Sequence, residues 1–173
     1  DVSISVIEAA DRILPALPGR LSAAATRELE HQRVKVLTGQ PVSEVRPSTV
    51  VMKDGTELPS EMTIWAAGIK APAFLATLDG LETNRGNQIK VKQTLEATTA
   101  PDIFAFGDCA ECPQPQSERP VPPRAQSAHQ QADTLFKTLC HRLEGREAVP
   151  FVYNDHGSLI NFSRYTPVGN LMG

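Results

Sequence analysis

The sequence contains few cysteines, no long apolar run and no excess of positive charge. Three cysteines among 173 residues are too few for a disulfide scaffold, and their odd number suits a reducing compartment. No run of about 18 apolar residues occurs, so we expect no segment to span a membrane. The formal net charge of -3 leaves no basic surface for the phosphate backbone of nucleic acid, which we therefore exclude as a partner.

Both ends lack the usual boundary signals of a complete chain. No basic, apolar leader precedes the first strand pattern, in which Val2, Ile4 and Val6 alternate with serine, so we expect a soluble, cytoplasmic polypeptide. The chain has no initiator methionine and closes on residues 169–173 without a polar tail. We therefore expect it to be a fragment of a longer protein.

The first part of the sequence alternates between strand and helix patterns. Helix-forming residues occupy 21–33, with Leu21, Ala25, Leu29 and Arg33 spaced four apart, which predicts an amphipathic helix. The Asp54-Gly55 pair predicts a hairpin turn. Strands are expected at residues 2–7, 34–37, 42–46, 49–53, 56–58 and 62–65. A strand, a helix, a strand, an antiparallel meander and a further strand together predict an α/β nucleotide-binding domain.

The second part combines short strand patterns with one long helix. A 3.6-residue period predicts a helix over residues 124–143, started by Pro122 and Pro123, and an apolar stripe of this kind normally faces a core. The stripe consists of Ala128, Ala132, Leu135, Phe136, Leu139 and Leu143. A buried strand is expected at 102–106, and shorter strands at 89–91, 149–153 and 158–162.

Two positions in the first part suit a nicotinamide dinucleotide. Glu8 ends the first strand, where a carboxylate can accept hydrogen bonds from both ribose hydroxyls of NADH and repel the 2′-phosphate of NADPH. Ala67 and Gly68 follow a strand pattern and are small enough to let a flat ring approach. The alternatives are a solvated acid and a plain strand-to-loop turn, and the sequence has no glycine-rich turn ahead of Glu8.

Gly107 and Asp108 are a more specific candidate because they end a predicted buried strand. At that place Gly107 would lie against a cofactor, where a side chain would clash. Open α/β sheets bind ligands at this edge, so Asp108 can accept hydrogen bonds from the ribityl or ribose hydroxyls of a flavin nucleotide. The alternative is an aspartate that only caps a loop.

The start of the long helix, at Ala125, is the third candidate. Unpaired N–H groups and a partial positive charge at a helix N-terminus would stabilise an electron-rich reduced flavin. A polar stripe follows, which consists of Gln126, His129, Gln130 and Asp133. Amide groups of this stripe can bond quinone carbonyls, and His129 can supply a proton. The alternative is an ordinary solvated helix face.

Cys109 and Cys112 form a single C-x-x-C pair. A redox dithiol and half of a zinc site are its two functional interpretations. No second pair exists, and the remaining thiol, Cys140, lies within the helix pattern. We therefore assign no metal ligand.

The segments around these candidates resemble a known family. Residues 98–108 (TTAPDIFAFGD) resemble the second FAD-binding motif of flavoproteins with two dinucleotide-binding domains, such as glutathione-reductase-like enzymes. Residues 122–132 (PPRAQSAHQQA) narrow the resemblance to type II, or alternative, NADH:quinone oxidoreductases. Residues 153–159 and 168–173 are similar to later segments of the same family, of bacterial members especially. The resemblance covers essentially the whole chain.

The resemblance implies an enzyme that passes hydride from NADH to FAD and then electrons to a membrane quinone, ubiquinone or menaquinone. It implies contacts with NADH at Glu8, Ala67 and Gly68. It implies a contact with FAD at Asp108, and it places Ala125 and Gln126 at the helix start beside the isoalloxazine. It implies a catalytic quinone pocket at Gln126, His129 and Gln130.

The fold implied is α/β, an incomplete tandem Rossmann-like (FAD/NAD(P)-binding) fold with an antiparallel β meander. Residues 1–68 would be the C-terminal portion of the NADH-binding domain, 69–148 part of the FAD-binding domain, and 149–173 the start of a C-terminal domain. The family's glycine loops and its membrane-seating segment are absent from the sequence, so we expect this polypeptide alone to be colourless and inactive. The parent would be a peripheral protein on the cytoplasmic side of the bacterial inner membrane, and uncovered sheet edges favour a homodimer.

Two other classes stay open on the residues alone. A pyridine-nucleotide disulfide reductase or a sulfide:quinone reductase-like flavoprotein would use Cys109 and Cys112 in a thiol mechanism. A non-enzymatic metal-binding or interaction domain would be built around the same pair and the proline-rich loop that follows it.

Overall fold

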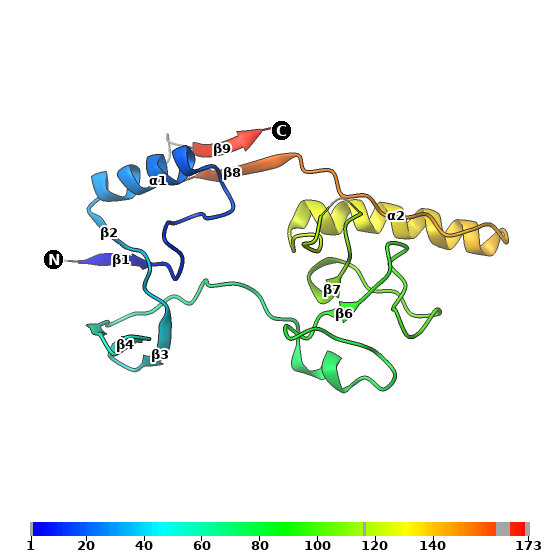
Figure 1. Ribbon diagram of the computed structural model, residues 1–173, viewed down its shortest axis with the longest axis horizontal. Coiled ribbons are helices and arrows are strands. Elements are labelled where there is room, and N and C mark those ends of the chain that lie inside the picture. Colours follow the sequence, from blue (N-terminus) through cyan, green and yellow to red (C-terminus); the bar gives the residue numbers. More distant parts are fainter. Residues whose placement is uncertain (1, 116, 162–166, 172–173) are drawn as a thin grey trace. The chain divides into compact units, whose positions relative to one another are not determined.

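The protein forms two compact units (Figure 1). The computed structural model describes residues 2–115, 117–161 and 167–171. The first unit comprises residues 1–66 and 156–173, and the second comprises residues 67–155. Residues 149–155 thus belong to the second unit, and the division into three domains ending at 68, 148 and 173 stays a prediction.

A strand, a helix and a strand open the first unit, as the sequence predicts. β1 (Ile4–Ile7) pairs in parallel with β2 (Val34–Leu37). Parallel neighbours need a crossover connection, which α1 (Gly19–His31) provides. The helix buries Ser22 and Ala25. The predicted helix over 21–33 is therefore confirmed, with its bounds shifted by two residues toward the N-terminus.

The antiparallel meander is confirmed as well. It consists of β3 (Val42–Arg46), β4 (Thr49–Met52) and β5 (Glu57–Pro59), with β4 in the centre and three of its four residues buried. At the turn between β4 and β5, a carboxylate oxygen of Asp54 accepts the main-chain N–H of Thr56 at 2.9 Å. This bond within the turn explains why the Asp54-Gly55 pair predicts the hairpin correctly.

The strand predicted at residues 62–65 is wrong. The segment is extended but pairs with no strand in the described ranges, and the side chains of Met62 and Ile64 are 81% and 82% exposed. An alternation of apolar residues becomes a strand only where a neighbour takes up its main-chain hydrogen bonds. No described segment does so here.

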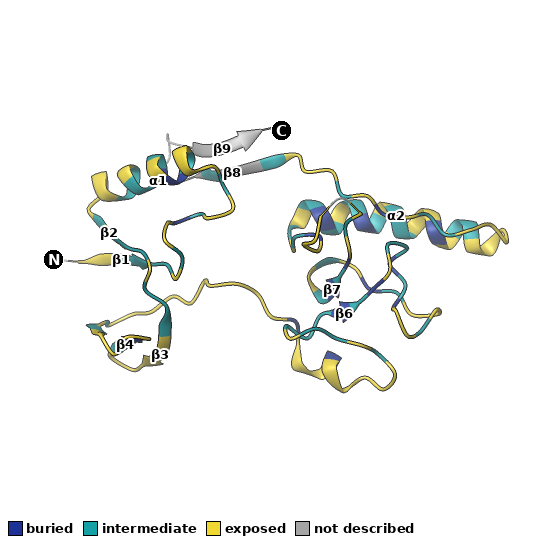
Figure 2. Ribbon diagram, in the orientation of Figure 1, coloured by how far each residue is buried: buried dark blue, intermediate teal, exposed yellow. Residues whose placement is uncertain are grey.

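The second unit has short elements around one apolar core (Figure 2). They are η1 (Ala73–Thr77), β6 (Ile89–Lys90), η2 (Gly107–Cys109), β7 (Ala110–Glu111) and α2 (Ala125–Leu143). β6 and β7 pair in parallel. The core consists of Ala71, Leu75, Ile89, Val91, Leu95, Ala97, Ala105, Ala110, Cys112, Val121 and Phe151.

The long helix buries polar residues rather than its apolar stripe. Its fully buried residues are Ser127, Gln131 and Thr138, whereas Phe136 and Leu143 are 69% and 90% exposed. The bounds of the helix are predicted well, but the buried face only in part, since Leu135 of the stripe is partly buried against the apolar core. The physical reason is that the neighbouring segments are irregular and present main-chain groups that need polar partners. One such pair joins Thr138 to the main chain of Val149, whose N–H lies 3.1 Å from the hydroxyl oxygen.

The buried strand predicted at residues 102–106 is also wrong. Only Phe104 pairs, in a single bridge with Glu96, and the side chains of Ile103 and Phe106 are exposed. With one bridge, no ladder forms within the part of the chain that the structure describes. Ala105 alone enters the core.

The strand predicted at residues 149–153 is replaced by an irregular segment. Phe151 is only 1% exposed in the core, and its N–H donates to the main-chain oxygen of Gln93 at 2.8 Å. In the first unit, β8 (Gly157–Asn161) pairs antiparallel with β9 (Pro167–Leu171). β8 covers most of the strand predicted at 158–162, whose last residue lies outside the described residues.

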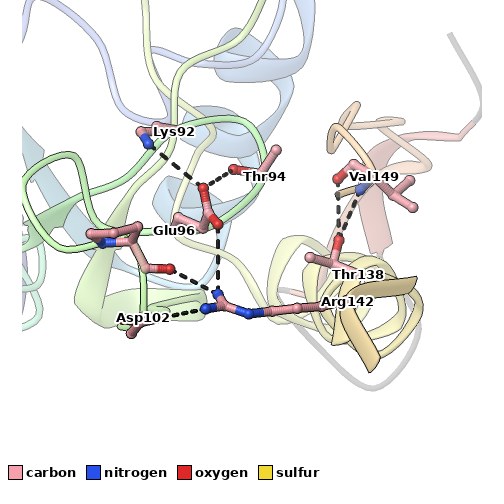
Figure 3. A network of polar contacts seen from close by, with 8 residues as sticks. Lys92, Thr94, Glu96, Asp102, Thr138, Arg142 and Val149 are labelled. Atoms are coloured by element: carbon pink, nitrogen blue, oxygen red, sulfur yellow. Dashed lines mark hydrogen bonds and ion pairs between the residues drawn. The ribbon is translucent and has the colours of Figure 1, made fainter. Parts of the chain in front are cut away.

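Arg142, in the last turn of α2, fastens the helix to the segment that leads into η2 (Figure 3). Its guanidinium donates to the main-chain oxygen of Pro101 at 3.0 Å, pairs with the carboxylate of Asp102 and lies 5.9 Å from the ring centroid of Phe104. Exposed ion pairs contribute little free energy individually. Together, the three contacts of Arg142 join the start of this segment to the last turn of α2.

Candidate functional site

The turn η2 packs against the first two turns of α2. The φ angle of Gly107 is +69°, and a Cβ atom at this position would lie 3.3 Å from the Cβ of Ala128. A left-handed backbone angle and a close neighbour both favour glycine. The near neighbour that the structure shows is the helix itself, and a cofactor contact at Gly107 stays a prediction.

Two glutamine side chains hold the main chain of this turn. Gln131 Oε1 accepts the N–H of Gly107 at 2.7 Å. Gln88 Nε2 donates to the main-chain oxygens of Asp108 and Ala110 at 3.1 and 3.4 Å. The carboxylate of Asp108 is exposed and has no hydrogen bond or ion pair with any residue that the structure describes. The turn thus holds the exposed carboxylate of Asp108 on a hydrogen-bonded backbone, where it can accept hydrogen bonds from a ligand.

The start of α2 offers main-chain donors. Arg124 is the N-cap residue, with extended backbone angles, and no side chain caps the helix. Ala125, the first helical residue, is exposed. A helix start of this kind carries N–H groups and a partial positive charge. The structure therefore brings Gly107, Asp108 and the start of α2 into one unit, with the turn η2 packed against α2.

The predicted quinone residues separate in the structure. Gln130 exchanges two hydrogen bonds with the main chain of Asn154, at 2.8 and 3.0 Å. Gln126 Nε2 donates to a carboxylate oxygen of Asp155 at 3.2 Å. His129 is exposed and makes no hydrogen bond or ion pair within the described ranges. The two amides therefore hold the segment that follows Tyr153, and only the imidazole is open to solvent.

Glu8 lies directly after β1 in the first unit. One of its carboxylate oxygens accepts the N–H of Ala10 at 2.9 Å, and its main-chain N–H donates to Leu37 at 2.8 Å. The residue stands at the carboxyl end of a parallel strand pair, which is the edge where α/β sheets bind ligands. Its side chain is half-buried and already oriented by the turn.

Ala67 and Gly68 lie at the start of the second unit and are both exposed. The φ angle of Gly68 is +72°, and a Cβ atom there would meet nothing within 4 Å. Within the described residues, the backbone angle is thus the one structural reason for glycine at this position.

The two thiols of the C-x-x-C pair differ. Cys112 is fully buried, and this burial raises the pKa of its thiol from 9.0 to about 11, against a smaller lowering by its hydrogen bond with Gln131. Cys109 is half-buried, and its thiol donates to the main-chain oxygen of Phe106 at 3.2 Å. A thiol that stays protonated is a poor nucleophile and a poor metal ligand.

Two absences hold for the described residues. No three or more His, Cys, Asp or Glu side chains gather there in a way that could hold a metal ion. No helix there has the length and apolar character to cross a membrane.

Gln131 and Gln88 are the residues of this site that the sequence pattern does not reveal. Gln131 stands beside Gln130 in the same run of polar residues, and nothing in the sequence distinguishes the two. Gln88 lies in a short loop with no motif of its own. Both are recognised only once the partners of the main-chain groups are known.

The sequence matches known proteins along its whole length. Residues 1–132 match the family described as pyridine nucleotide-disulphide oxidoreductase. The type II NADH:quinone oxidoreductase of Haemophilus influenzae is 41% identical over 170 residues, which cover 98% of this chain and 38% of that protein. The Staphylococcus saprophyticus protein of the same name is 30% identical, over 99% of this chain and 43% of its own length. The chain thus spans about four-tenths of the length of these relatives.

Solved structures share the fold. NDH2 from Plasmodium falciparum in complex with NADH matches with a TM-score of 0.82 at 18% identity, over 98% of this chain and 50% of that chain. A FAD-dependent pyridine nucleotide-disulphide oxidoreductase from Desulfovibrio vulgaris matches with a TM-score of 0.69 at 26% identity, over 92% and 40%. The α/β, Rossmann-like FAD/NAD-binding fold expected from the sequence is thereby confirmed.

Proposed function

Because the chain belongs to the pyridine nucleotide-disulphide oxidoreductase family, we propose that it forms part of a type II NADH:quinone oxidoreductase. The observation that carries this proposal is the 41% identity with the Haemophilus influenzae enzyme across 98% of the chain. The whole protein would oxidise NADH, with FAD as its cofactor, and reduce a quinone, ubiquinone or menaquinone. Residues 1–68 would belong to its NADH-binding part and residues 69–148 to its FAD-binding part.

FAD fits the turn and helix start of the second unit. Asp108 offers an exposed carboxylate without a partner among the described residues, which suits the hydroxyls of a ribityl chain. Gly107 keeps the turn close to the helix, and Ala125 and Gln126 begin that helix at its electropositive end. When bound, FAD supplies the ring that accepts hydride from NADH and passes electrons on. The protein residues hold and orient it.

NADH fits Glu8 at the end of the parallel strand pair. The bond from Ala10 fixes one carboxylate oxygen, and the other oxygen remains for ribose hydroxyls. The negative charge would repel the 2′-phosphate of NADPH. Ala67 and Gly68 would lie near the nicotinamide, which their small side chains permit.

A quinone would be reduced beside the first turns of α2. Gln126 and Gln130 have amide groups that can bond carbonyl oxygens, and they now bond the segment at Asn154 and Asp155. His129 is exposed and suited to supply a proton. The proposal includes peripheral attachment to the cytoplasmic side of the bacterial inner membrane, since the quinone is dissolved in that membrane. Assembly as a homodimer is part of it as well.

A thiol mechanism, as in disulphide reductases of the same family, finds little support. The buried thiol of Cys112 has a pKa raised to about 11, so that very little thiolate exists at neutral pH. The pair is better explained by packing, because Cys112 belongs to the apolar core.

The test uses the protein expressed from its complete reading frame. We expect stoichiometric FAD by absorption, bleaching of the flavin by NADH without oxygen, and recovery of colour on addition of a soluble quinone. NADPH should bleach it far more slowly, and Glu8→Ser should narrow that difference. A double variant, Cys109→Ser with Cys112→Ser, should keep its quinone reductase activity. A colourless protein, or a need for both thiols, would contradict the proposal.

A further inference from the structure

The main chain on both sides of Asp108 is held by side chains from two separate segments. We propose that Gln131 and Gln88 are positioning residues that fix the turn at Asp108 in the conformation that binds FAD. The proposal rests on the proposed function, because it concerns the flavin contact assigned there to Asp108. Neither glutamine is expected to touch the cofactor itself, since each acts through the backbone of the turn.

Gln131 holds the turn from the helix side. It is only 2% exposed, although it stands on a face of α2 where an apolar residue would ordinarily be found. A buried amide is costly unless its polar atoms have partners. Its oxygen accepts the N–H of Gly107 at 2.7 Å, and its side chain also hydrogen-bonds the buried thiol of Cys112. The Gln131 side chain therefore has a polar partner at two points of the same loop, Gly107 and Cys112.

Gln88, which precedes the turn in the sequence, bonds its main chain on the other side of Asp108. Its Nε2 donates to the main-chain oxygens of Asp108 and Ala110 at 3.1 and 3.4 Å. Asn84 orients this amide, because its Nδ2 donates to Gln88 Oε1 at 3.0 Å and its Oδ1 accepts the N–H of Gln88 at 3.0 Å. A second bond joins Asn84 to Glu111, just beyond the turn, at 2.5 Å.

The two side chains are complementary in chemistry. Gln131 gives an acceptor to the N–H of Gly107, and Gln88 gives a donor to the carbonyl of Asp108. The peptide group that precedes Gly107 and the peptide group that follows Asp108 are thus each hydrogen-bonded by a glutamine, while the carboxylate of Asp108 bonds no residue that the structure describes. A group fixed before binding avoids the entropy cost of ordering it at the moment of binding. The arrangement should therefore strengthen FAD binding without any direct contact.

The experiment measures the FAD dissociation constant of the protein expressed from its complete reading frame, by flavin fluorescence after reconstitution of the apoprotein. Gln131→Met keeps the volume but removes the acceptor, and we expect about a tenfold loss of FAD affinity, as for one well-placed hydrogen bond. Amide exchange at Gly107 should accelerate by a similar factor in the apoprotein. Gln131→Glu keeps an oxygen within reach in either protonation state and should restore the affinity to within about threefold of wild type.

Two further variants separate positioning from general stability. Thr138→Val removes a buried hydrogen bond on the same helix, far along it from the turn, and should lower the unfolding temperature without changing FAD affinity or Gly107 exchange. Gln88→Leu removes both bonds from the half-buried Gln88 to the turn, and about a fivefold loss of FAD affinity is expected. The KM for NADH should stay within about twofold of wild type in all variants, because the substituted residues belong to the second unit and Glu8 belongs to the first.

The outcomes are distinct. Unchanged FAD affinity in Gln131→Met and Gln88→Leu, with wild type binding FAD, would overturn the inference and leave the proposed function standing. An equal loss of affinity in Thr138→Val would overturn it as well, because the effect would then follow stability alone. A wild-type protein that binds no FAD would instead overturn the proposed function.

Discussion

The two units differ in how each is stabilised internally. In the first unit, β1 and β2, and then β3, β4 and β5, pair their main-chain groups in ladders, with one register shift between Val42 and Glu44. In the second unit the only paired strands, β6 and β7, have two residues each within the described ranges, and buried polar side chains bond the main chain instead. A main-chain group that no ladder satisfies must find another partner when it is buried. Polar side chains therefore become structural where regular structure is scarce.

The same contrast separates the two candidate acids. Glu8 stands at the end of a ladder, and its backbone is fixed by main-chain bonds to Leu37 and from Gln40. Asp108 stands on a turn that side chains fix. We therefore expect binding at Glu8 to tolerate substitutions among its neighbours, and binding at Asp108 to depend on them.

The largest effect should come from Phe151, the side chain that closes the core of the second unit. Phe151→Ala should destabilise that unit by about 3–5 kcal/mol, because the ring is almost fully buried and leaves a cavity. Amide exchange followed against urea reports each unit separately. Exchange in β4 should remain as in wild type; equal acceleration there would show that the two units unfold together and that the comparison fails.

The reciprocal change lies in the central strand of the meander. Met52 is buried in β4, and Met52→Ala should cost the first unit about 2–4 kcal/mol. Exchange at Gly107 and along α2 should be unaffected. Protection lost in the second unit would contradict the division.

A smaller loss of unfolding free energy is expected where a side chain, rather than a neighbouring strand, bonds the main chain. Thr138→Val leaves the N–H of Val149 without its partner, which should cost about 1–2 kcal/mol in urea unfolding. Thr134→Val is the matched control, since that hydroxyl only bonds its own helix at Gln130 O, at 3.1 Å. Similar losses of unfolding free energy in both variants would contradict a stabilising role of the bond between Thr138 and Val149.

The buried thiol should make the second unit sensitive to alkali. The folded pKa of Cys112 is raised to about 11 from 9.0, so the folded state keeps the proton longer than the unfolded state does. Its contribution to stability is full below pH 9 and is lost as the pH rises from about 9 through about 11. In Cys112→Ala, the free energy of unfolding should fall less steeply over this pH range, as measured by urea unfolding at each pH. At pH 8, thiol reagents should modify Cys109 well before Cys112, and equal rates would contradict its burial.

The smallest effect concerns an exposed ion pair. Lys90 Nζ lies 2.6 Å from a carboxylate oxygen of Glu82, and its hydrogen bond and charge lower the pKa of Glu82 below 4.5. The pair adds stability above pH 4.5 and loses it as the pH falls through the lowered pKa. An NMR titration of Glu82 should show this midpoint, and Lys90→Met should return it toward 4.5. A midpoint unchanged by the substitution would show that the pair does not form in solution.

The regular part of the fold could be predicted from the sequence. The helix at α1, the meander and the bounds of α2 follow from local patterns, since spacing, turn chemistry and prolines act within a few residues. The segments at 62–65, 102–106 and 149–153 could not, because a strand depends on a partner elsewhere in the chain. Their apolar letters are the same as those of true strands.

The candidate site was predictable in part. Gly107, Asp108 and the helix at Ala125 stand out by motif, and the structure places them in one unit. Their roles toward FAD, like those of Gln126, His129 and Gln130 toward quinone, stay predictions. Gln131 could not be singled out, because its value lies in one bond to a main-chain group that a sequence does not show as unpaired.

The most direct measurement is the FAD dissociation constant of Asp108→Ala in the protein expressed from its complete reading frame. Loss of a charged acceptor for the cofactor's hydroxyls should weaken binding by about tenfold to a hundredfold. The matched control is Asp79→Ala, an exposed carboxylate of the same unit that lies outside the turn and should leave the constant within about twofold of wild type. Binding of FAD by Asp108→Ala as tightly as by wild type would contradict the assignment of this turn to the flavin.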